Sequence, residues 1–295
     1  MTHFSSPSLP PIGRRRFLQA GLCGAAGVVL YPGEIERHWI DVTHREFHLP
    51  GLSPGMNGMR IVQLSDIHLD EYTEPYFLRQ VVDRVNRLQP DAVFLTGDFV
   101  SDILGNRDFA LGAARQCAQI LSGIQCKRVY AILGNHDVAV DAKQVTAALE
   151  ANGIPVLRNA YMPFDFAGGR IWLAGLDDVI EGHPDPDLAI PASIRNRPNE
   201  PVVLLCHAPD YADTLLSHPA GKSVALMLSG HTHGGQVRLP FFGALELPIW
   251  GKKYVEGSFQ LGSMQLYVNR GIGTIGVPFR LNCPPEITVH TLRAA

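Results

Sequence analysis

Short apolar runs recur along the chain, and each is followed at once by a few small or polar residues. Runs of four to six apolar residues bounded in this way are typical of buried strands. Between the first three runs the apolar positions follow a helical period instead, as in Phe77, Val81, Val82, Val85 and Leu88. The strand-like runs occupy residues 59–64, 92–95, 129–133, 202–206 and 224–228, and the expected helices occupy residues 75–89, 108–121 and 142–151.

The first half of the chain therefore predicts a β-α-β-α-β-α order with a parallel sheet. The second half predicts mostly strands: a hairpin over 161–166 and 170–174, a proline-rich loop over 177–201, a short helix over 211–216, an aromatic loop over 240–257, and late strands over 265–268 and 287–292. A sheet completed in this way is mixed. Two packed sheets with helices outside are expected, in a single domain over residues 35–295.

Polar residues follow five of the apolar runs, at the ends of the expected strands. In an extended chain, residues two apart face the same side, so paired side chains there converge. Carboxylate, amide and imidazole ligands together suit divalent ions such as Mn, Fe or Zn, and the acids suffice for two ions that share one carboxylate. The positions are Asp66 and His68, Asp98, Asn135 and His136, His207, and His231 and His233.

Each of these residues has a structural alternative when it is taken alone. Asn135 and Asp137 can cap a helix, Asp98 can shape a turn, and a histidine pair in a loop is often solvated. A second group, His38, His44 and His48, lies in the strand-like stretch 35–49. We expect this stretch to be an edge strand with a polar outer face, because no carboxylate-glycine turn lies beside it.

Composition narrows the function classes. The formal charge of −3 argues against binding to long nucleic acids, which requires a basic face. The five cysteines are scattered and show no CxxC spacing, so neither a disulfide framework nor a zinc ribbon is expected.

The N-terminal 34 residues differ in character from the rest. Arg14-Arg15-Arg16-Phe17-Leu18 resembles the core of a twin-arginine export signal, and the residues that follow it to Tyr31 are mildly apolar. A basic tail is the alternative. The resemblance implies an interaction with the export machinery, and a location in the periplasm or at the outer face of the cytoplasmic membrane. Without a clear cleavage site, the segment is also a candidate membrane anchor.

The five polar clusters, in this order, resemble those of the calcineurin-like metallophosphoesterase superfamily. The glycine-rich segments 234–236 and 269–273 add a likeness to its YaeI-type bacterial phosphodiesterases. The resemblance implies an α/β fold, a four-layer α-β-β-α sandwich with two mixed β-sheets, and a site for two divalent metal ions. It also implies phosphodiester hydrolysis by a metal-bridging hydroxide, with His136 assisting the leaving group. One ion would be held by Asp66, His68, Asp98 and His233, and the other by Asp98, Asn135, His207 and His231, so that Asp98 bridges.

Several further residues each have two candidate roles, one in the site and one in the structure. Arg270 is expected to bind substrate phosphate, as Arg280 also can, although either can be structural. Asp178 and His183 lie in the proline-rich loop and can line the site or be solvated. The apolar residues of 241–250 can contact lipid or pack on the core.

Three functions remain open at this stage. A phosphodiesterase is favoured, with a substrate that can be lipid-linked or a nucleotide, and with a membrane surface as a potential partner. A non-catalytic scaffold of the same fold is the first alternative, although such a protein should lose ligands that this chain keeps. A nuclease is the second, and the acidic balance weighs against it.

Overall fold

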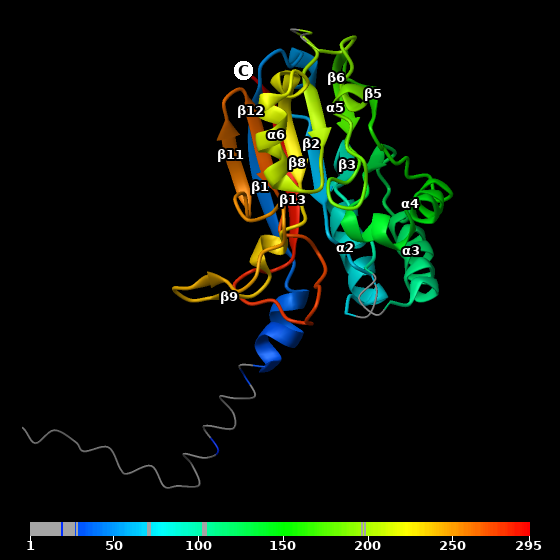
Figure 1. Cartoon of the computed structure of the whole chain (residues 1–295), viewed down its shortest axis with the longest axis vertical. Coiled ribbons are helices and arrows are strands. Elements are labelled where there is room, and N and C mark those ends of the chain that lie inside the picture. The colour runs from blue at the N-terminus through cyan, green and yellow to red at the C-terminus, as the bar shows by residue number, and fades with distance from the viewer. Residues whose placement is uncertain are drawn as a thin grey trace, which may run out of the picture.

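The computed structural model describes residues 29–69, 72–101, 105–195, 197 and 199–295, together with Gln19 and Gly27. Two β-sheets pack against each other, and helices cover their outer faces (Figure 1). This arrangement confirms the predicted four-layer α-β-β-α sandwich with two mixed sheets. Among the described residues, no helix is long and apolar enough to cross a membrane.

The first sheet has the strand order β1-β13-β2-β3-β4. Strand β13 runs antiparallel to β2, and the other neighbours are parallel. Three helices cover its outer face (Figure 1). The strands are β1 (Asp41–Leu49), β2 (Arg60–Leu64), β3 (Ala92–Leu95), β4 (Val129–Ala131) and β13 (Glu286–Ala294), and the helices are α2 (Pro75–Leu88), α3 (Arg107–Leu121) and α4 (Asn135–Glu150).

The second sheet has the order β11-β12-β8-β7-β6-β5, with antiparallel pairs at its two edges. Its strands are β5 (Ala160–Phe166), β6 (Gly169–Gly175), β7 (Val202–Leu205), β8 (Val224–Ser229), β11 (Gly257–Leu261) and β12 (Met264–Val268); its outer helices are α5 (Pro186–Ala189) and α6 (Ala212–Ser217). A small hairpin of β9 (Arg238–Leu239) and β10 (Gly243–Ala244) projects from the sandwich (Figure 1).

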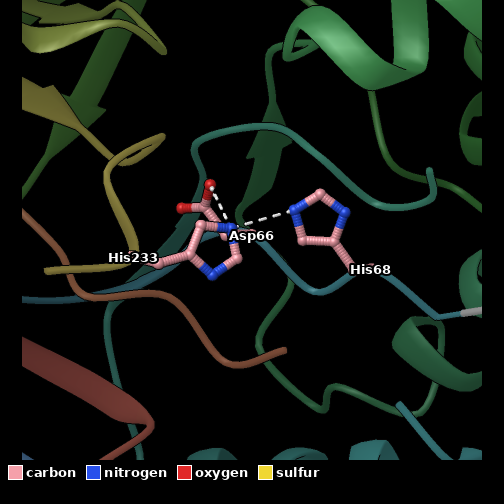
Figure 2. A group of neighbouring side chains, drawn as sticks. All are labelled: Asp66, His68 and His233. Atoms are coloured by element: carbon pink, nitrogen blue, oxygen red, sulfur yellow. Dashed lines mark hydrogen bonds and ion pairs between the residues drawn. The ribbon is translucent and has the colours of Figure 1, made fainter. Parts of the chain in front are cut away.

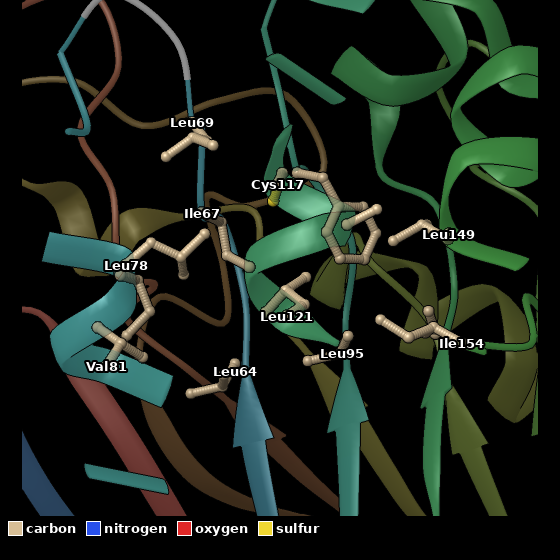
Figure 3. Packing of buried hydrophobic residues seen from close by; sticks show 14 of the residues in the cluster. Leu64, Ile67, Leu69, Leu78, Val81, Leu95, Cys117, Leu121, Leu149 and Ile154 are labelled. Atoms are coloured by element: carbon tan, nitrogen blue, oxygen red, sulfur yellow. The ribbon is translucent and has the colours of Figure 1, made fainter. Parts of the chain in front are cut away.

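The strands alternate their side chains between two cores, as the pleat of a strand requires. Ile61 and Phe94 point into the space between the sheets, where they meet Leu173 of the second sheet. Val62 packs in the cluster under the helices, part of which is shown in Figure 3. Both faces of the central strands are therefore buried, which explains why their sequences are continuously apolar.

Three local expectations differ from the structure. Helix α4 has a kink at Asp141, and the part after the kink is the helix expected from residue 142. The part that begins at Asn135 was not predicted; the Gly134 N–H donates to Oδ2 of Asp137 at 3.0 Å and closes its first turn. Residues 35–38, expected as the start of a strand, lie in helical turns that begin at Tyr31, with Pro32 in the first turn, and the strand begins at Asp41. Strand β11 was not predicted, because its alternating polar residues at a sheet edge resemble a loop.

Candidate metal centre

The polar residues predicted as ligands converge where the strands of the two sheets end. Two groups form, and within each the potential ligand atoms all lie within 4.8 Å of one another. The first group is Asp66, His68 and His233, and the second is Asp98, His207 and His231; all six side chains are buried.

In the first group two imidazoles and a carboxylate face a common point (Figure 2). Nε2 of His68 lies 3.1 Å from Nε2 of His233, and Nε2 of His233 lies 3.6 Å from Oδ1 of Asp66. Burial lowers the pKa of His68 to about 3 and also lowers that of His233. Both rings are therefore neutral near pH 7 and can offer a lone pair to a cation.

In the second group, backbone contacts orient both imidazoles. Nδ1 of His207 donates to the carbonyl of Thr96 at 2.7 Å, which turns Nε2 toward Oδ2 of Asp98 at 3.1 Å. Nε2 of His231 donates to the carbonyl of Ile249 at 2.7 Å, so Nδ1 is its remaining ring nitrogen. Backbone carbonyls that accept from one ring nitrogen are the usual means of orienting a metal-binding histidine.

Asp98 lies between the two groups. Its Oδ2 is 3.1 Å from Nε2 of His207 and 3.6 Å from Nε2 of His68, so one carboxylate contacts a member of each group. Two nearby cations repel each other, and a shared carboxylate is the usual way to hold them. This position fits the predicted bridging role.

The donor set fits divalent cations. Oδ1 of Asn135 is buried and has no hydrogen-bond partner within the described chain. An unpaired buried amide oxygen costs free energy unless a ligand satisfies it, and a cation held by the adjacent second group would do so. Carboxylate, amide and imidazole without thiolate suits Mn, Fe or Zn.

Five of the ligand candidates have backbone conformations that residues other than glycine rarely adopt. The φ angles are 50° for Asp66, 45° for His68, 56° for Asp98, 73° for His231 and 51° for His233. Each costs of order 1 kcal/mol or more, and such strain is found where the surrounding structure holds a functional site in place.

Two glycines permit the close packing of these loops. A Cβ at Gly134 would lie 2.2 Å from Oδ1 of Asp98, and one at Gly230 would lie 2.3 Å from Oδ2 of Asp66. The sequence motifs Gly-Asn-His and Gly-His-Thr-His thus contain their glycines because the two acidic ligands occupy that space.

Asp137 holds the turn that carries Asp98. Its carboxylate accepts backbone N–H bonds from Asp98 at 2.8 Å, Phe99 at 2.9 Å, Val100 at 3.3 Å and Gly134 at 3.0 Å. The bond from Gly134 agrees with the capping role considered for Asp137, and the other three bonds hold the turn that follows strand β3.

A cavity of about 600 Å³ opens over the metal-binding groups. Its polar wall includes Asp98, Asn135, His136, His231 and His233. The ring of His136 packs edge-on against that of His68, with 5.3 Å between centroids. The rest of the lining is mostly apolar and includes Ile180, Val237, Leu245, Pro248, Ile249, Ile275 and Val277.

The two arginines considered for phosphate binding do not line this cavity. The guanidinium of Arg270 donates to Asp41 at 2.7 Å and lies 3.4 Å from Oε2 of Glu286. Arg280 is fully buried and donates to three backbone carbonyls, including that of Gly273. Both side chains therefore stabilise the C-terminal segment, and the contacts argue against the predicted substrate role of Arg270.

The remaining candidate site residues differ in how deeply they are buried. Asp178 is buried, and its Oδ1 accepts N–H bonds from Ile180 and Glu181. His183 is exposed. His44 and His48 are exposed on edge strand β1, as predicted.

The residues that sequence reasoning missed are the apolar cavity walls, above all Ile180, Val237, Ile275 and Val277. They come from three separate segments and have no chemical signature. Only their position next to candidate ligands, as for Val237 after His233, could have drawn attention to them.

Comparison with known proteins agrees with this geometry. Residues 59–235 match the family described as calcineurin-like phosphoesterase. A Bacillus subtilis protein, the metallophosphoesterase YkuE, is 36% identical over 294 residues, covering 96% of this chain and 98% of its own. The phosphodiesterase YaeI of Escherichia coli is 30% identical, covering 95% and 99%.

Two further similarities are more distant. The UDP-2,3-diacylglucosamine pyrophosphatase LpxG of Chlamydia trachomatis is 27% identical, covering 88% of this chain and 91% of its own. The structure of a putative 5′-nucleotidase from Staphylococcus aureus superposes with a TM-score of 0.50 at 12% identity, covering 81% of this chain and 55% of that one. The latter likeness concerns the fold alone.

Proposed function

Because the chain belongs to the calcineurin-like phosphoesterase family and is a metal-dependent phosphoric ester hydrolase, we propose that it hydrolyses phosphodiester or pyrophosphate bonds in lipid-linked substrates. The observation that carries this proposal is the cavity, whose lining combines candidate metal ligands with aliphatic side chains. A phosphoester with an apolar chain matches both parts of this lining. Relatives named a phosphodiesterase and a diacylglucosamine pyrophosphatase support the choice.

We assign the candidate ligands as two sets that share Asp98. Asp66, His68 and His233 would complete one ion site with Asp98, and Asn135, His207 and His231 would complete the other. Bound divalent ions would supply Lewis acidity toward the phosphoryl oxygens and a lowered pKa for water. The protein itself holds the ligand side chains in place, and the apolar side chains of the cavity exclude water beside them.

His136 is assigned to the leaving group. Its imidazole lines the cavity beside His68, while its backbone N–H donates to Oδ1 of Asp98 at 3.0 Å. This backbone bond fixes the residue at the cavity without using a ring nitrogen. A ring nitrogen can then donate a proton to the departing oxygen.

The His136→Ala variant tests this role. Metal content should remain near that of the wild type, and the rate should fall roughly a hundred- to ten-thousand-fold for an alkyl phosphodiester. The loss should be smaller for a nitrophenyl diester, whose leaving group needs little protonation. Loss of a metal ion from the variant, or equal losses for both substrates, would contradict the assignment.

Substrate class is tested with a matched pair of nucleoside-diphosphate sugars, one with acyl chains and one without. Purified protein loaded with Mn²⁺ should hydrolyse the acylated compound with the higher kcat/KM. Equal hydrolysis of both compounds would contradict the proposed preference for lipid-linked substrates, whereas the assignment as a phosphoric ester hydrolase would stand. No hydrolysis of any phosphoester by protein with two bound ions would instead favour the non-catalytic scaffold.

We place the protein at the outer face of the cytoplasmic membrane or in the periplasm, on the basis of the twin-arginine resemblance, which lies outside the described residues. Residues close to Tyr31 are bonded to the C-terminal part of the fold. The Arg280 N–H donates to the carbonyl of Pro32 at 3.0 Å, and the Cys283 N–H donates to Oε1 of Glu36 at 2.7 Å. A signal-processing event would therefore have to spare these residues to leave the fold intact.

A further inference from the structure

The segment 239–250, which we name the apolar loop, exposes its hydrophobic side chains. Phe241 is fully exposed and Phe242 is 84% exposed, at the tip of the β9-β10 hairpin. The loop contains one charged residue, Glu246. Two neighbouring exposed phenylalanines form an apolar patch of the kind that marks an interaction site.

The apolar loop is continuous with the cavity over the metal centre. Leu245 and Ile249 are 63% and 58% exposed, yet both also line the cavity. The carbonyl of Ile249 accepts from Nε2 of His231, so the loop is tied directly to a candidate ligand. Whatever covers the tip therefore also lies at the mouth of the cavity.

A second exposed apolar feature is attached to the same place in the fold. The beginning of the described chain exposes Val29, Leu30 and Ile35, each by more than half. Figure 1 shows this helical segment and the β9 hairpin at the same end of the molecule.

Two consecutive residues connect the two features. The Arg280 N–H donates to Pro32, and the carbonyl of Leu281 accepts from the N–H of Arg238 at the base of the hairpin. The helical segment and the hairpin are thus held next to each other, and one flat surface can contact both.

We propose that this surface is a lipid bilayer, and that the apolar loop inserts into it so that the cavity opens at the membrane. The chain leading to the helical segment favours a bilayer over a protein partner. Residues 17–33 carry no charged side chain and follow three consecutive arginines, Arg14, Arg15 and Arg16. An apolar stretch beside a basic cluster is typical of segments that contact anionic membranes. Exposed Tyr31, Trp39 and Trp250 add aromatic side chains of the kind found at membrane interfaces.

The experiment places an environment-sensitive fluorophore on the loop tip of the full chain. Phe242→Cys is labelled after Cys23 and Cys126 have been replaced by Ser, and vesicles of phosphatidylethanolamine and phosphatidylglycerol are added. The label should shift to the blue, and lipids with spin labels in their acyl chains should quench it. The matched control is Phe109→Cys, an exposed phenylalanine of helix α3, which lies on the other side of the molecule from the β9 hairpin (Figure 1), and this label should not respond.

Adding Phe241→Asp to the labelled chain distinguishes insertion of the loop from mere proximity through the N-terminal segment. A charge at the tip should lower the vesicle-bound fraction of the label by roughly a hundredfold or more, because a phenylalanine is lost from the apolar phase and a carboxylate must enter it. Phe241 and Phe242 do not line the cavity, so hydrolysis of a soluble nitrophenyl diester should be unchanged and confirms folding.

Three outcomes would overturn the proposal. They are an unresponsive label at position 242, an equal response at position 109, and a blue shift that needs no vesicles and grows with protein concentration, which would indicate a second copy of the chain. The proposal is independent of the substrate assignment. If the label at position 242 responds to vesicles but the protein does not hydrolyse lipid-linked compounds, the membrane-docking proposal stands and only the proposed function is contradicted.

Discussion

Replacing Asp137 by Asn should destabilise the fold and empty the metal centre, although Asp137 is not a proposed ligand. Its carboxylate accepts four backbone N–H bonds, two at Oδ1 from Phe99 and Val100 and two at Oδ2 from Asp98 and Gly134. An asparagine has the same shape but only one acceptor oxygen. Whichever way the amide turns, its NH₂ group then faces two backbone donors.

The size of the effect follows from these contacts. A hydrogen bond to a charged acceptor contributes about 1.5–3 kcal/mol, and a buried donor left without a partner costs a similar amount. Burial and the nearby Asp98 carboxylate raise the pKa of Asp137 to about 8, so this magnitude applies to unfolding measured above that pH, where the carboxyl group is ionised. Losing two such bonds should therefore lower the free energy of unfolding by about 3–6 kcal/mol. With a urea dependence of about 3 kcal/mol per M, the midpoint should fall by about 1–2 M.

The Asp137→Asn substitution should also weaken metal binding. Asp98 adopts a φ of 56°, which its backbone bond to Asp137 helps to hold. Released from that bond, the Asp98 turn can relax toward an ordinary conformation. The carboxylate proposed to bridge the ions would move with it, and metal content per chain should fall.

Urea unfolding of the metal-free protein and metal analysis of the loaded protein measure the two effects. Asp108→Asn is the matched control, since this residue is exposed in the first turn of α3 and should leave both quantities unchanged. An Asp137→Asn protein with a wild-type midpoint and two bound ions would refute the reasoning.

The strands and the ligands could be predicted from the sequence because both depend on local patterns. A run such as 92–95 can bury both faces only as a central strand, and Asp98 then follows at the sheet edge where the other strands also end. The start of α4 could not be located, because the bonds that Asp137 accepts come from residues almost forty positions away as well as from Gly134.

The cavity and the loop depend on contacts that no local pattern contains. Ile180, Val237 and Ile275 come together from separate segments, and an isoleucine next to a glycine looks the same in a core or in a cavity wall. For the loop, the sequence left both core packing and lipid contact open, without favouring lipid contact. The structure exposes Phe241 and Phe242 and so excludes core packing for the tip.

Three further changes test export, metal sharing and acid stability. Replacing Arg14 and Arg15 by Lys should hold the protein in the cytoplasm, and an unchanged location on cell fractionation would refute the export signal. Asp98→Asn should cost one metal ion and nearly all activity, so two ions with normal turnover would exclude its bridging role. His290 is fully buried, its Nε2 donates to Oε1 of Gln63 at 2.9 Å, and burial lowers its pKa to about 3. The unfolded chain binds a proton at this histidine below its ordinary pKa of about 6.5 whereas the folded chain does not, so stability is lost as the pH falls from about 6.5 toward 3. Between pH 6.5 and 4.5 this single group should remove about 2.3 kcal/mol. In the metal-free protein, His290→Gln should therefore lose less stability than the wild type over that interval in urea titrations. Identical losses would show that the ring is already protonated in the fold.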